Sequence, residues 1–351
     1  MIKRRSTKKI NIGTVNIGGD SPISVQSMTK TDTRDVNATV RQIVELEKAG
    51  CEIVRLAVLN ESAADAILEI KQQVSIPMVA DIHFDWKLAK KAISNGIDGL
   101  RINPGNIGAQ WKVQELVEMC KDKDIPIRIG VNAGSLEKEL LNKYGHPTPE
   151  AIVESAMRHI EILETLAFSK IKVSLKASNV STTVEAYRLF SKQYDYPLHI
   201  GISEAGPAFS GMVKSAVGLG ILLNEGIGDT MRVSLTAQPF EEVRVAYEIL
   251  KSLNIRQHGV NIVSCPTCGR TRVNLMQVVA DAERKFMNID KNVTVAIMGC
   301  EVNGPGEAKE ADYGIASGTG EGILFKKGQV IGKVKEEEML ESLIGLINSS
   351  D

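Results

Sequence analysis

The sequence has little of several features that mark specialised classes of protein. Only 4% of its 351 residues are aromatic, five are cysteine, and 42 basic residues nearly balance 43 acidic ones. The formal net charge of -1 argues against broad binding of nucleic acid through the phosphate backbone, which needs a basic surface. Five cysteines in so long a chain do not form a disulfide framework, so metal or redox chemistry is the better use for them.

Long hydrophobic runs are also missing. No segment approaches the roughly 18 uninterrupted apolar residues of a membrane helix. The basic start, residues 1–5, is followed by polar residues and not by the apolar core of a signal peptide. We therefore expect a cytoplasmic protein that binds neither membranes nor nucleic acid. The 43% of hydrophobic residues are enough to build a large buried core.

Short apolar runs rich in β-branched residues alternate with longer stretches that have helical spacing of Leu, Ile and Ala. The runs predict eight strands, at residues 25–28, 53–58, 78–84, 99–103, 126–132, 171–177, 198–204 and 230–235. Eight β/α units in about 250 residues fit a closed TIM (β/α)8 barrel. The long connection after residue 132 predicts two helices, at 135–144 and 150–166. An open doubly wound sheet is the alternative, which strand counting does not exclude.

The pattern changes after residue 253. We expect a substrate-binding TIM-barrel domain at 1–255 and a small α/β domain at 256–351 that carries three of the five cysteines. In this second domain the sequence predicts strands at 259–263 and 293–298, a helix at 273–286, a Gly-rich stretch up to 322, a hairpin at 322–335 and a final helix at 336–347.

Three cysteines are placed where strands are predicted to end. Cys265 and Cys268 have C-x-x-C spacing in a turn before a helix, whose N-terminus favours thiolates. Cys300 follows the predicted strand at 293–298. Three sulfurs at the ends of adjacent strands can converge on one metal group. Cys51 and Cys120 lie at the edges of predicted elements, where they are expected to be small buried hydrophobes.

A lone C-x-x-C is more often a zinc site or a redox dithiol, but the Cys300 turn favours an iron-sulfur cluster. Zinc usually recruits four Cys or His ligands, and the nearest candidate, His258, is predicted to lie across a strand from Cys265. An iron-sulfur cluster uses mainly thiolates, and a fourth ligand of another type leaves one iron distinct. Glu307, in a Gly-rich turn after Cys300, is the candidate oxygen ligand.

Five of the predicted strands contain a cation, although strands of a parallel barrel are normally apolar on both faces. These residues are Arg55, Arg101, Arg128, Lys176 and Arg232. An unpaired buried charge is costly, and the strands supply few acids. Arginine suits phosphate oxygens, so we predict a phosphorylated or diphosphorylated small substrate at the carboxyl ends of the strands. The alternative for any one cation is an ion pair with an acid on a neighbouring helix.

Neutral and acidic side chains accompany these cations. The neutral candidates for hydrogen bonds to substrate are Asn103, Asn132, Ser174 and Ser234. Either Glu204 or Asp81 is a candidate general acid, although neighbouring cations favour the ionised form of each. We interpret His83 as a polar core group.

Two motifs connect these observations to a known family. The chain contains Cys-Pro-Thr-Cys-Gly-Arg at 265–270 and Met-Gly-Cys-Glu-Val-Asn-Gly-Pro-Gly-Glu-Ala at 298–308. With the barrel segments Leu-Arg-Ile-Asn-Pro-Gly-Asn and Ile-Arg-Ile-Gly-Val-Asn, it resembles the 4-hydroxy-3-methylbut-2-enyl diphosphate synthases of the non-mevalonate isoprenoid pathway. The resemblance covers essentially the whole chain, in the compact two-domain bacterial form.

The resemblance implies one 4Fe-4S cluster per chain, held by Cys265, Cys268, Cys300 and Glu307. It implies reductive ring opening and dehydration of 2-C-methyl-D-erythritol 2,4-cyclodiphosphate, with electrons from ferredoxin or flavodoxin. It also implies a homodimer in which the cluster domain of one subunit caps the barrel of the other. We expect the five cations to anchor the diphosphate, Glu307 to give way to substrate, and Glu204 to supply a proton.

Two other classes of function remain open from the sequence. One is a zinc-stabilised regulatory protein that binds phosphate, which would be colourless and without redox chemistry. The other is a pterin-type barrel transferase with a structural metal domain, which would need no reductant.

Overall fold

The computed structural model describes residues 2–287, 289–300, 306 and 309–349, and the chain divides into two compact units, Met1–Arg256 and Gln257–Asp351. The first unit contains an eight-stranded parallel sheet in the order β8-β7-β6-β5-β4-β3-β10-β9. A parallel bridge between Val173 and Leu198 brings its two ends together. The predicted TIM barrel is therefore confirmed, and the open sheet is excluded.

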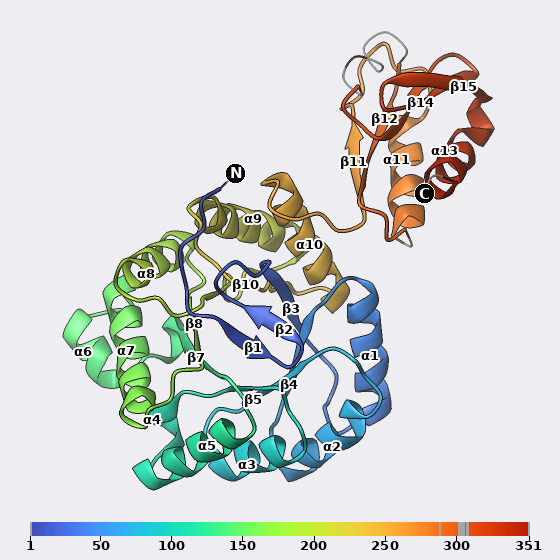
Figure 1. Ribbon diagram of the computed structural model, residues 1–351. Helices are drawn as coiled ribbons and strands as arrows, with labels where there is room; N and C mark the ends of the chain where they lie inside the picture. The colour runs from blue at the N-terminus through green and yellow to red at the C-terminus, as the bar shows by residue number, and fades with distance from the viewer. Residues whose placement is uncertain (1, 288, 301–305, 307–308, 350–351) are drawn as a thin grey trace. The chain divides into compact units, whose positions relative to one another are not determined.

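The barrel strands are short, and helices surround them (Figure 1). The strands are β3 (Ser24–Met28), β4 (Ile53–Ala57), β5 (Met78–Asp81), β6 (Gly99–Arg101), β7 (Ile127–Asn132), β8 (Ile171–Lys176), β9 (His199–Ile200) and β10 (Thr230–Met231). The crossover helices are α1 (Val36–Lys48), α2 (Glu61–Lys71), α3 (Trp86–Ser94), α5 (Gln110–Asp122), α7 (Pro149–Thr165), α8 (Val180–Gln193), α9 (Ala208–Asn224) and α10 (Pro239–Ser252).

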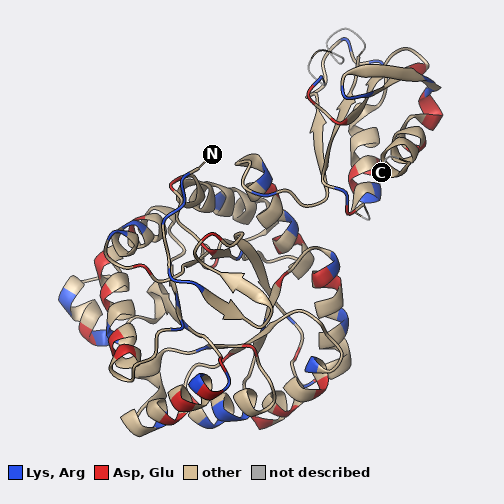
Figure 2. Ribbon diagram, in the orientation of Figure 1, with Lys and Arg blue, Asp and Glu red and all other residues tan. Residues whose placement is uncertain are grey.

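These helices follow from their sequence spacing. In α2, for example, Ala63, Ile67 and Ile70 recur every three or four residues and are all buried against the sheet. The helix begins after Asn60, whose side chain accepts a hydrogen bond from the backbone N–H of Ala63. Charged residues of both signs cover the outer helices (Figure 2), as expected of faces that meet water.

An N-terminal hairpin, which was not predicted from the sequence, closes one end of the barrel. It consists of β1 (Ile10–Ile12) and β2 (Val15–Ile17). Ile12 and Ile17 pack with Ile53 and Val79, which lie near the starts of their strands. The amino ends of the strands are thus sealed by apolar side chains, and polar side chains gather at the carboxyl ends.

Two predicted barrel strands are much shorter than expected. The runs predicted at 198–204 and 230–235 contain only the two-residue strands β9 and β10. Beyond these strands, isolated hydrogen bonds continue the pairing, such as the one from Arg232 N–H to Ile200 O at 3.0 Å. Gly201 lies close to its neighbours there, since an added Cβ would lie 2.5 Å from Nζ of Lys176 and 2.6 Å from the Arg232 carbonyl oxygen. The apolar pattern continues there, but the backbone leaves the regular ladder.

The long connection after β7 contains two helices, as predicted, preceded by a short turn. These elements are η1 (Ala133–Ser135), α6 (Lys138–Tyr144) and α7. A further short helix, α4 (Pro104–Ile107), follows β6. Of the helices in the described ranges, none has both the length and the apolar character to cross a membrane.

The second unit is built on a five-stranded sheet in the order β11-β12-β13-β14-β15. The strands are β11 (Val260–Ser264), β12 (Val293–Met298), β13 (Tyr313–Ser317), β14 (Glu321–Lys326) and β15 (Gln329–Lys335). The helices are α11 (Leu275–Phe286), η2 (Glu336–Glu338) and α13 (Met339–Asn348). The apolar faces of α11 and α13 share a core with the sheet. The predicted hairpin and final helix are confirmed.

Strand β13 was hidden in the predicted Gly-rich stretch. All five of its residues are buried, and it pairs parallel to β12 and antiparallel to β14. A Cβ on Gly314 would lie 2.1 Å from the ring of Phe325, so the glycine gives that ring its place in the core. Glycine normally weakens a strand, and here a close side-chain approach explains it.

Candidate functional site

A cavity of about 550 Å³ lies at the carboxyl ends of the barrel strands. Nine of the predicted site residues line it: Arg55, Asp81, Arg101, Arg128, Asn132, Lys176, Glu204, Arg232 and Ser234. The rest of the lining comes from His83, Ser203, residues 133–135 and residues 177–178. Five cations therefore share this cavity with two carboxylates.

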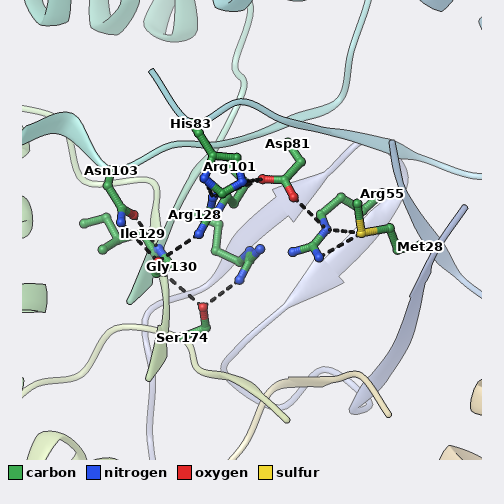
Figure 3. Close-up of polar contacts among 10 residues, drawn as sticks. All are labelled: Met28, Arg55, Asp81, His83, Arg101, Asn103, Arg128, Ile129, Gly130 and Ser174. Atoms are coloured by element: carbon green, nitrogen blue, oxygen red, sulfur yellow. Dashed lines mark hydrogen bonds and ion pairs between the residues drawn. The ribbon is translucent and has the colours of Figure 1, made fainter. Parts of the chain in front are cut away.

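Asp81, at the end of β5, is the carboxylate that pairs with two of the arginines (Figure 3). Its Oδ1 lies 3.2 Å from Nη1 of Arg101, and its Oδ2 lies 3.5 Å from Nε of Arg55. Burial alone would raise the pKa of Asp81, but the charges of Arg55 and Arg101, with that of Arg128, outweigh burial and hold the pKa below its ordinary value. Asp81 is thus an ionised anchor for arginines and a poor proton donor.

Arg128, on β7, has no carboxylate partner in the described part of the chain. Its Nη1 donates a 2.6 Å hydrogen bond to Oγ of Ser174, while its Nε and Nη2 have no partner there. Burial first, and then Arg55 and Arg101, lower the pKa of Arg128 well below its ordinary value. A guanidinium stays protonated in proteins, so the buried charge of Arg128 destabilises the protein while no anion is bound. A bound anion would remove that destabilisation.

Lys176, at the end of β8, and Arg232, just after β10, complete the set of cations. Burial, followed by Arg128 and Arg232, lowers the pKa of Lys176 well below its ordinary value. The acid nearest to Arg232 is Glu242 in the first turn of α10, with 3.9 Å between Nε and Oε2. Glu242 is buried and also accepts from Leu235 N–H. Glu242 was not predicted, because it lies on a helix and not on a strand. The available signal was its position shortly after the segment that contains Arg232.

Asn103 does not line the cavity. Its side chain is used within the barrel wall, where its Nδ2 donates to Gly130 O at 3.1 Å and its Oδ1 accepts from Gly130 N–H at 2.9 Å. It joins the ends of β6 and β7 and leaves no obvious capacity for substrate. Ser174 is likewise occupied, by Arg128.

Glu204 lies on the rim of the cavity and is exposed. Its backbone has a positive φ of 51°, which is uncommon for a residue with a side chain. The chain therefore turns sharply after the ladder ends and places this carboxyl near the opening.

His83 is not a core group, so the interpretation made from the sequence is wrong. Its side chain is 53% exposed at the cavity, and its ring lies 3.0–3.1 Å from Nη1 of Arg101. Burial and the charge of Arg101 lower the pKa of His83. The neutral ring this favours can accept a hydrogen bond from Arg101 or serve substrate. The strand predicted over 78–84 ends at Asp81, so His83 lies in the loop beyond it. The spacing of apolar residues did not show where the strand ends.

His159, on α7, links two loops of the cavity wall. Its Nδ1 accepts from Gly105 N–H at 3.1 Å, in the loop after β6, and its Nε2 lies 3.2 Å from Oε1 of Glu137, after β7. The bond from His159 is the main reason that the pKa of Glu137 falls to about 2. A Cβ on Gly105 would lie 2.8 Å from the His159 ring, so glycine is needed for this contact.

The three cysteines of the second unit follow two adjacent parallel strands. Ser264 is in register with Ile297, so Cys265 and Cys300 both leave the sheet at its carboxyl edge. The Gly299 N–H donates to Sγ of Cys265 at 3.4 Å, and Arg272 N–H donates to Gly299 O at 3.1 Å, which ties the two loops together. Cys268 is exposed.

This edge suits a cluster held by thiolates. No disulfide joins the five described cysteines, and a backbone N–H aimed at sulfur is a feature of iron-sulfur sites. His258 precedes β11, so it is separated from Cys265 by the length of that strand, about 16 Å for five residues. That separation disfavours the zinc alternative. Among the residues the structure covers, no three metal-ligating side chains are already grouped, and Glu307 lies outside the described residues.

Cys51 and Cys120 belong to the barrel core. Both are buried, and burial raises the pKa of each thiol to about 12. They are small core residues, as predicted.

The sequence matches two family descriptions in succession. Residues 7–247 match the GcpE TIM-barrel domain, and residues 261–349 match the GcpE protein C-terminal domain. A 4-hydroxy-3-methylbut-2-en-1-yl diphosphate synthase (flavodoxin) from Thermodesulfovibrio yellowstonii is 62% identical, over 98% of this chain and 99% of that protein. Proteins of the same name from Geobacter sulfurreducens and Clostridium perfringens are 61% and 56% identical, over 97% and 99% of this chain and 97% and 100% of theirs.

The structure is also similar to solved barrels. A dihydropteroate synthase from Yersinia pestis aligns with a TM-score of 0.52 and 11% identity, over 72% of this chain and 100% of that one. An N-acetylneuraminic acid (sialic acid) synthetase from Leptospira borgpetersenii aligns with a TM-score of 0.53 and 13% identity, over 81% of this chain and 98% of that one. Identities this low show a shared fold and say nothing about substrate.

Proposed function

The chain belongs to the GcpE family of 4-hydroxy-3-methylbut-2-en-1-yl diphosphate synthases, and we propose that its barrel cavity binds the cyclic diphosphate on which these enzymes act. The reaction is the reductive ring opening and dehydration of 2-C-methyl-D-erythritol 2,4-cyclodiphosphate to (E)-4-hydroxy-3-methylbut-2-enyl diphosphate, in the non-mevalonate isoprenoid pathway. It consumes two electrons. The observation that carries the proposed binding site is the charge of the cavity, where five cations face two carboxylates.

The cations divide into two groups. Arg55 and Arg101 are already held by Asp81 and have fixed positions. Arg128, Lys176 and Arg232 have no hydrogen-bonded carboxylate within the described ranges, so their N–H groups are available to phosphate oxygens. Asn132 and Ser234 add neutral donors in the same lining, whereas Asn103 acts by holding the wall.

A 4Fe-4S cluster, one per chain, is the cofactor proposed for the second unit. Cys265, Cys268 and Cys300 would hold it by thiolate bonds, with Glu307 as the fourth ligand. When bound, such a cluster supplies electrons one at a time. The shared sheet edge of the cysteine loops and the N–H donated to Cys265 support this assignment.

Proton supply is proposed for Glu204 in preference to Asp81. The pKa of Asp81 is held low by its arginines, so Asp81 is the weaker acid donor. Glu204 lies in the lining, is exposed to solvent that can reprotonate it, and is not among the residues ion-paired to the arginines.

The electron donor and the assembly are further parts of the proposal. The names of the relatives specify flavodoxin, which supports flavodoxin over ferredoxin as the donor here. The family resemblance supports a homodimer in which the cluster domain of one subunit caps the barrel of its partner.

The cluster assignment is tested on protein purified and, where needed, reconstituted under strict anaerobiosis. We expect a broad absorption band near roughly 400 nm, about four irons with matching sulfide per chain, and turnover of the cyclodiphosphate with a reductant. Cys300→Ser should lose the band, the iron and the turnover. Cys120→Ala, which removes a buried thiol of the barrel, is the matched control and should keep them.

Two results would contradict the proposal. Full absorbance and turnover in Cys300→Ser would remove that cysteine from the ligand set. A colourless wild-type protein that takes up one zinc and refuses iron would replace the redox enzyme with a phosphate-binding barrel.

A further inference from the structure

A sixth cation, which the sequence analysis did not single out, lies beneath the cavity. Lys172 is on β8, on the same face as Ser174 and Lys176, because side chains alternate along a strand. Lys176 lines the cavity, but Lys172 does not. Only 2% of Lys172 is exposed, and its Nζ has no hydrogen-bond partner in the described part of the structure. A lysine buried in this way is rare unless it is paired.

The groups facing Lys172 are mainly cations. Arg128 is its register partner on β7, and Arg55 acts on it from β4. Lys176 is on the same strand, and the fully buried His199 is on β9.

The one acid that acts on Lys172, Asp229, is engaged elsewhere. Its Oδ1 accepts from Arg4 and Thr7, and its Oδ2 accepts from Leu198 N–H. No carboxylate therefore neutralises Lys172 directly among the residues described.

These surroundings favour the uncharged amine while the cavity is empty. Burial and the charge of Arg128 lower the pKa of Lys172 well below its ordinary value, and Asp229 offsets only part of this. A dianionic ligand held by Arg128 and Lys176 would add two negative charges directly above this layer. Its field acts in the opposite direction to that of the cations, because an opposite charge stabilises the protonated form.

Building on the proposed function, we propose that Lys172 is a charge-compensating residue of the diphosphate site, an amine in the empty barrel that takes one proton from solvent when the cyclic diphosphate binds. No bond of the substrate changes in this step. The proton moves from water or buffer to Nζ, and the new positive charge offsets part of the negative charge of the ligand above it. Lys172 thus acts on substrate through its field and without direct contact.

Calorimetric binding of the cyclodiphosphate to the oxidised holoenzyme tests this directly. In a cyclic diphosphate each phosphorus carries one strongly acidic hydroxyl, so the ligand does not titrate near neutral pH. The dependence of the binding heat on buffer ionisation enthalpy, in HEPES and in Tris at about pH 8, then counts protons taken up by the protein. We expect net uptake by the wild type and a loss of up to one proton per site in Lys172→Met.

Lys170→Met is the matched control. Lys170 lies two residues earlier, has a partly exposed side chain and pairs with Asp124, so its variant should take up as many protons as the wild type. His83→Asn identifies any share of the uptake that belongs to the imidazole at the cavity wall. A second readout is the affinity for substrate over about pH 7 to 9, which should fall with rising pH in the wild type and vary less in Lys172→Met.

Unchanged proton uptake in Lys172→Met, or no uptake by the wild type across that pH range, would overturn the role of Lys172. Should Lys172→Met fail to fold, Lys172→Arg, whose guanidinium is permanently charged, replaces it and should also lose the uptake. A wild type that binds no cyclodiphosphate at all would instead overturn the proposed function, because the binding isotherm and its buffer dependence are separate readouts.

Discussion

At the scale of single residues, the cavity is a set of charges that the protein alone leaves unbalanced. Asp81 holds Arg55 and Arg101, and Glu242 approaches Arg232 without hydrogen-bonding to its Nε. Arg128 has two nitrogen atoms without partners in the described chain and is only 4% exposed. An empty site of this kind is unfavourable, and the binding of an anion recovers that free energy.

Replacement of Arg128 should therefore affect stability and affinity in opposite directions. In Arg128→Met, we expect the Kd for the cyclodiphosphate to rise at least about thirty-fold, which corresponds to about 2 kcal/mol. The free energy of unfolding of the empty enzyme should rise, by about 1–4 kcal/mol, because an uncompensated buried charge is replaced by an apolar chain of similar volume. Calorimetric binding and denaturant unfolding measure the two quantities.

Arg188→Met provides the control for this pair of measurements. Arg188 is on the outside of α8 and pairs with Glu225 and Glu185 at the surface. Its replacement should change neither quantity appreciably. An unchanged affinity in Arg128→Met would show that Arg128 does not anchor the diphosphate.

At the scale of elements, the site depends on loops that are held by hydrogen bonds made away from the cavity. The loops after β6 and β7 are joined by Asn103 to Gly130 inside the wall and by His159 between Gly105 and Glu137 outside it. The second link holds the segment that leads from Asn132 to Glu137, part of which lines the cavity. A helix behind the barrel thus helps to position loops whose residues line the cavity.

Loss of the His159 link should loosen this wall. In His159→Phe, which keeps the ring volume, Gly105 N–H loses its partner, and Glu137 loses the contact with His159 but keeps the hydrogen bond from Oγ of Ser155. The expected cost is about 1–3 kcal/mol in the free energy of unfolding. The KM for substrate should rise more than kcat falls, because the chemistry is elsewhere. Steady-state kinetics and thermal unfolding measure these effects, and His146→Phe, at an exposed site, should show neither.

The pH dependence of this effect has a definite sign. The pKa of Glu137 is lowered from 4.5 to about 2, so its ionised form contributes stability that is full above the ordinary value of 4.5. That contribution is lost as the pH falls through about 2. The difference in unfolding free energy between wild type and His159→Phe should therefore shrink on acidification below pH 4.5. A difference that grew on acidification would contradict the assignment.

At the scale of the whole molecule, the chain is two units with separate apolar cores. Among the described residues, none belongs to both the barrel core and the core of the second unit. The proposed substrate groups are all in the first unit, and the proposed cluster ligands are all in the second. The proposed reaction requires both, so the way in which the units of one or two chains combine would decide whether a site is complete.

Complementation between two inactive variants distinguishes the arrangements. In a co-expressed mixture of Arg128→Met and Cys300→Ser, a dimer capped by the partner's cluster domain contains one intact barrel facing one intact cluster. Equal random pairing should then restore about one quarter of wild-type activity. A mixture of Cys268→Ser with Cys300→Ser is the control and should stay inactive. No restored activity in the first mixture would mean that each chain uses its own cluster domain.

The sequence by itself determined the barrel, the position of most strands, the set of lining cations and the three cysteines. These are local properties, since alternation of strand and helix, a cation inside an apolar strand and C-x-x-C spacing are all visible within a few residues. The motif at 298–308 was specific enough to indicate the family. Even the excess of positive charge was visible, because the strands themselves contain so few acids.

Only the tertiary structure decided which of those residues have hydrogen-bonding groups or charges that other residues do not already use. Asn103 is consumed by Gly130, His83 is exposed at the cavity, Glu242 reaches the site from a helix, and Lys172 lies below it. Strand β13 and the N-terminal hairpin also depend on distant partners. Pairing, burial and depth arise from distances between segments far apart in the chain, and no local pattern contains them.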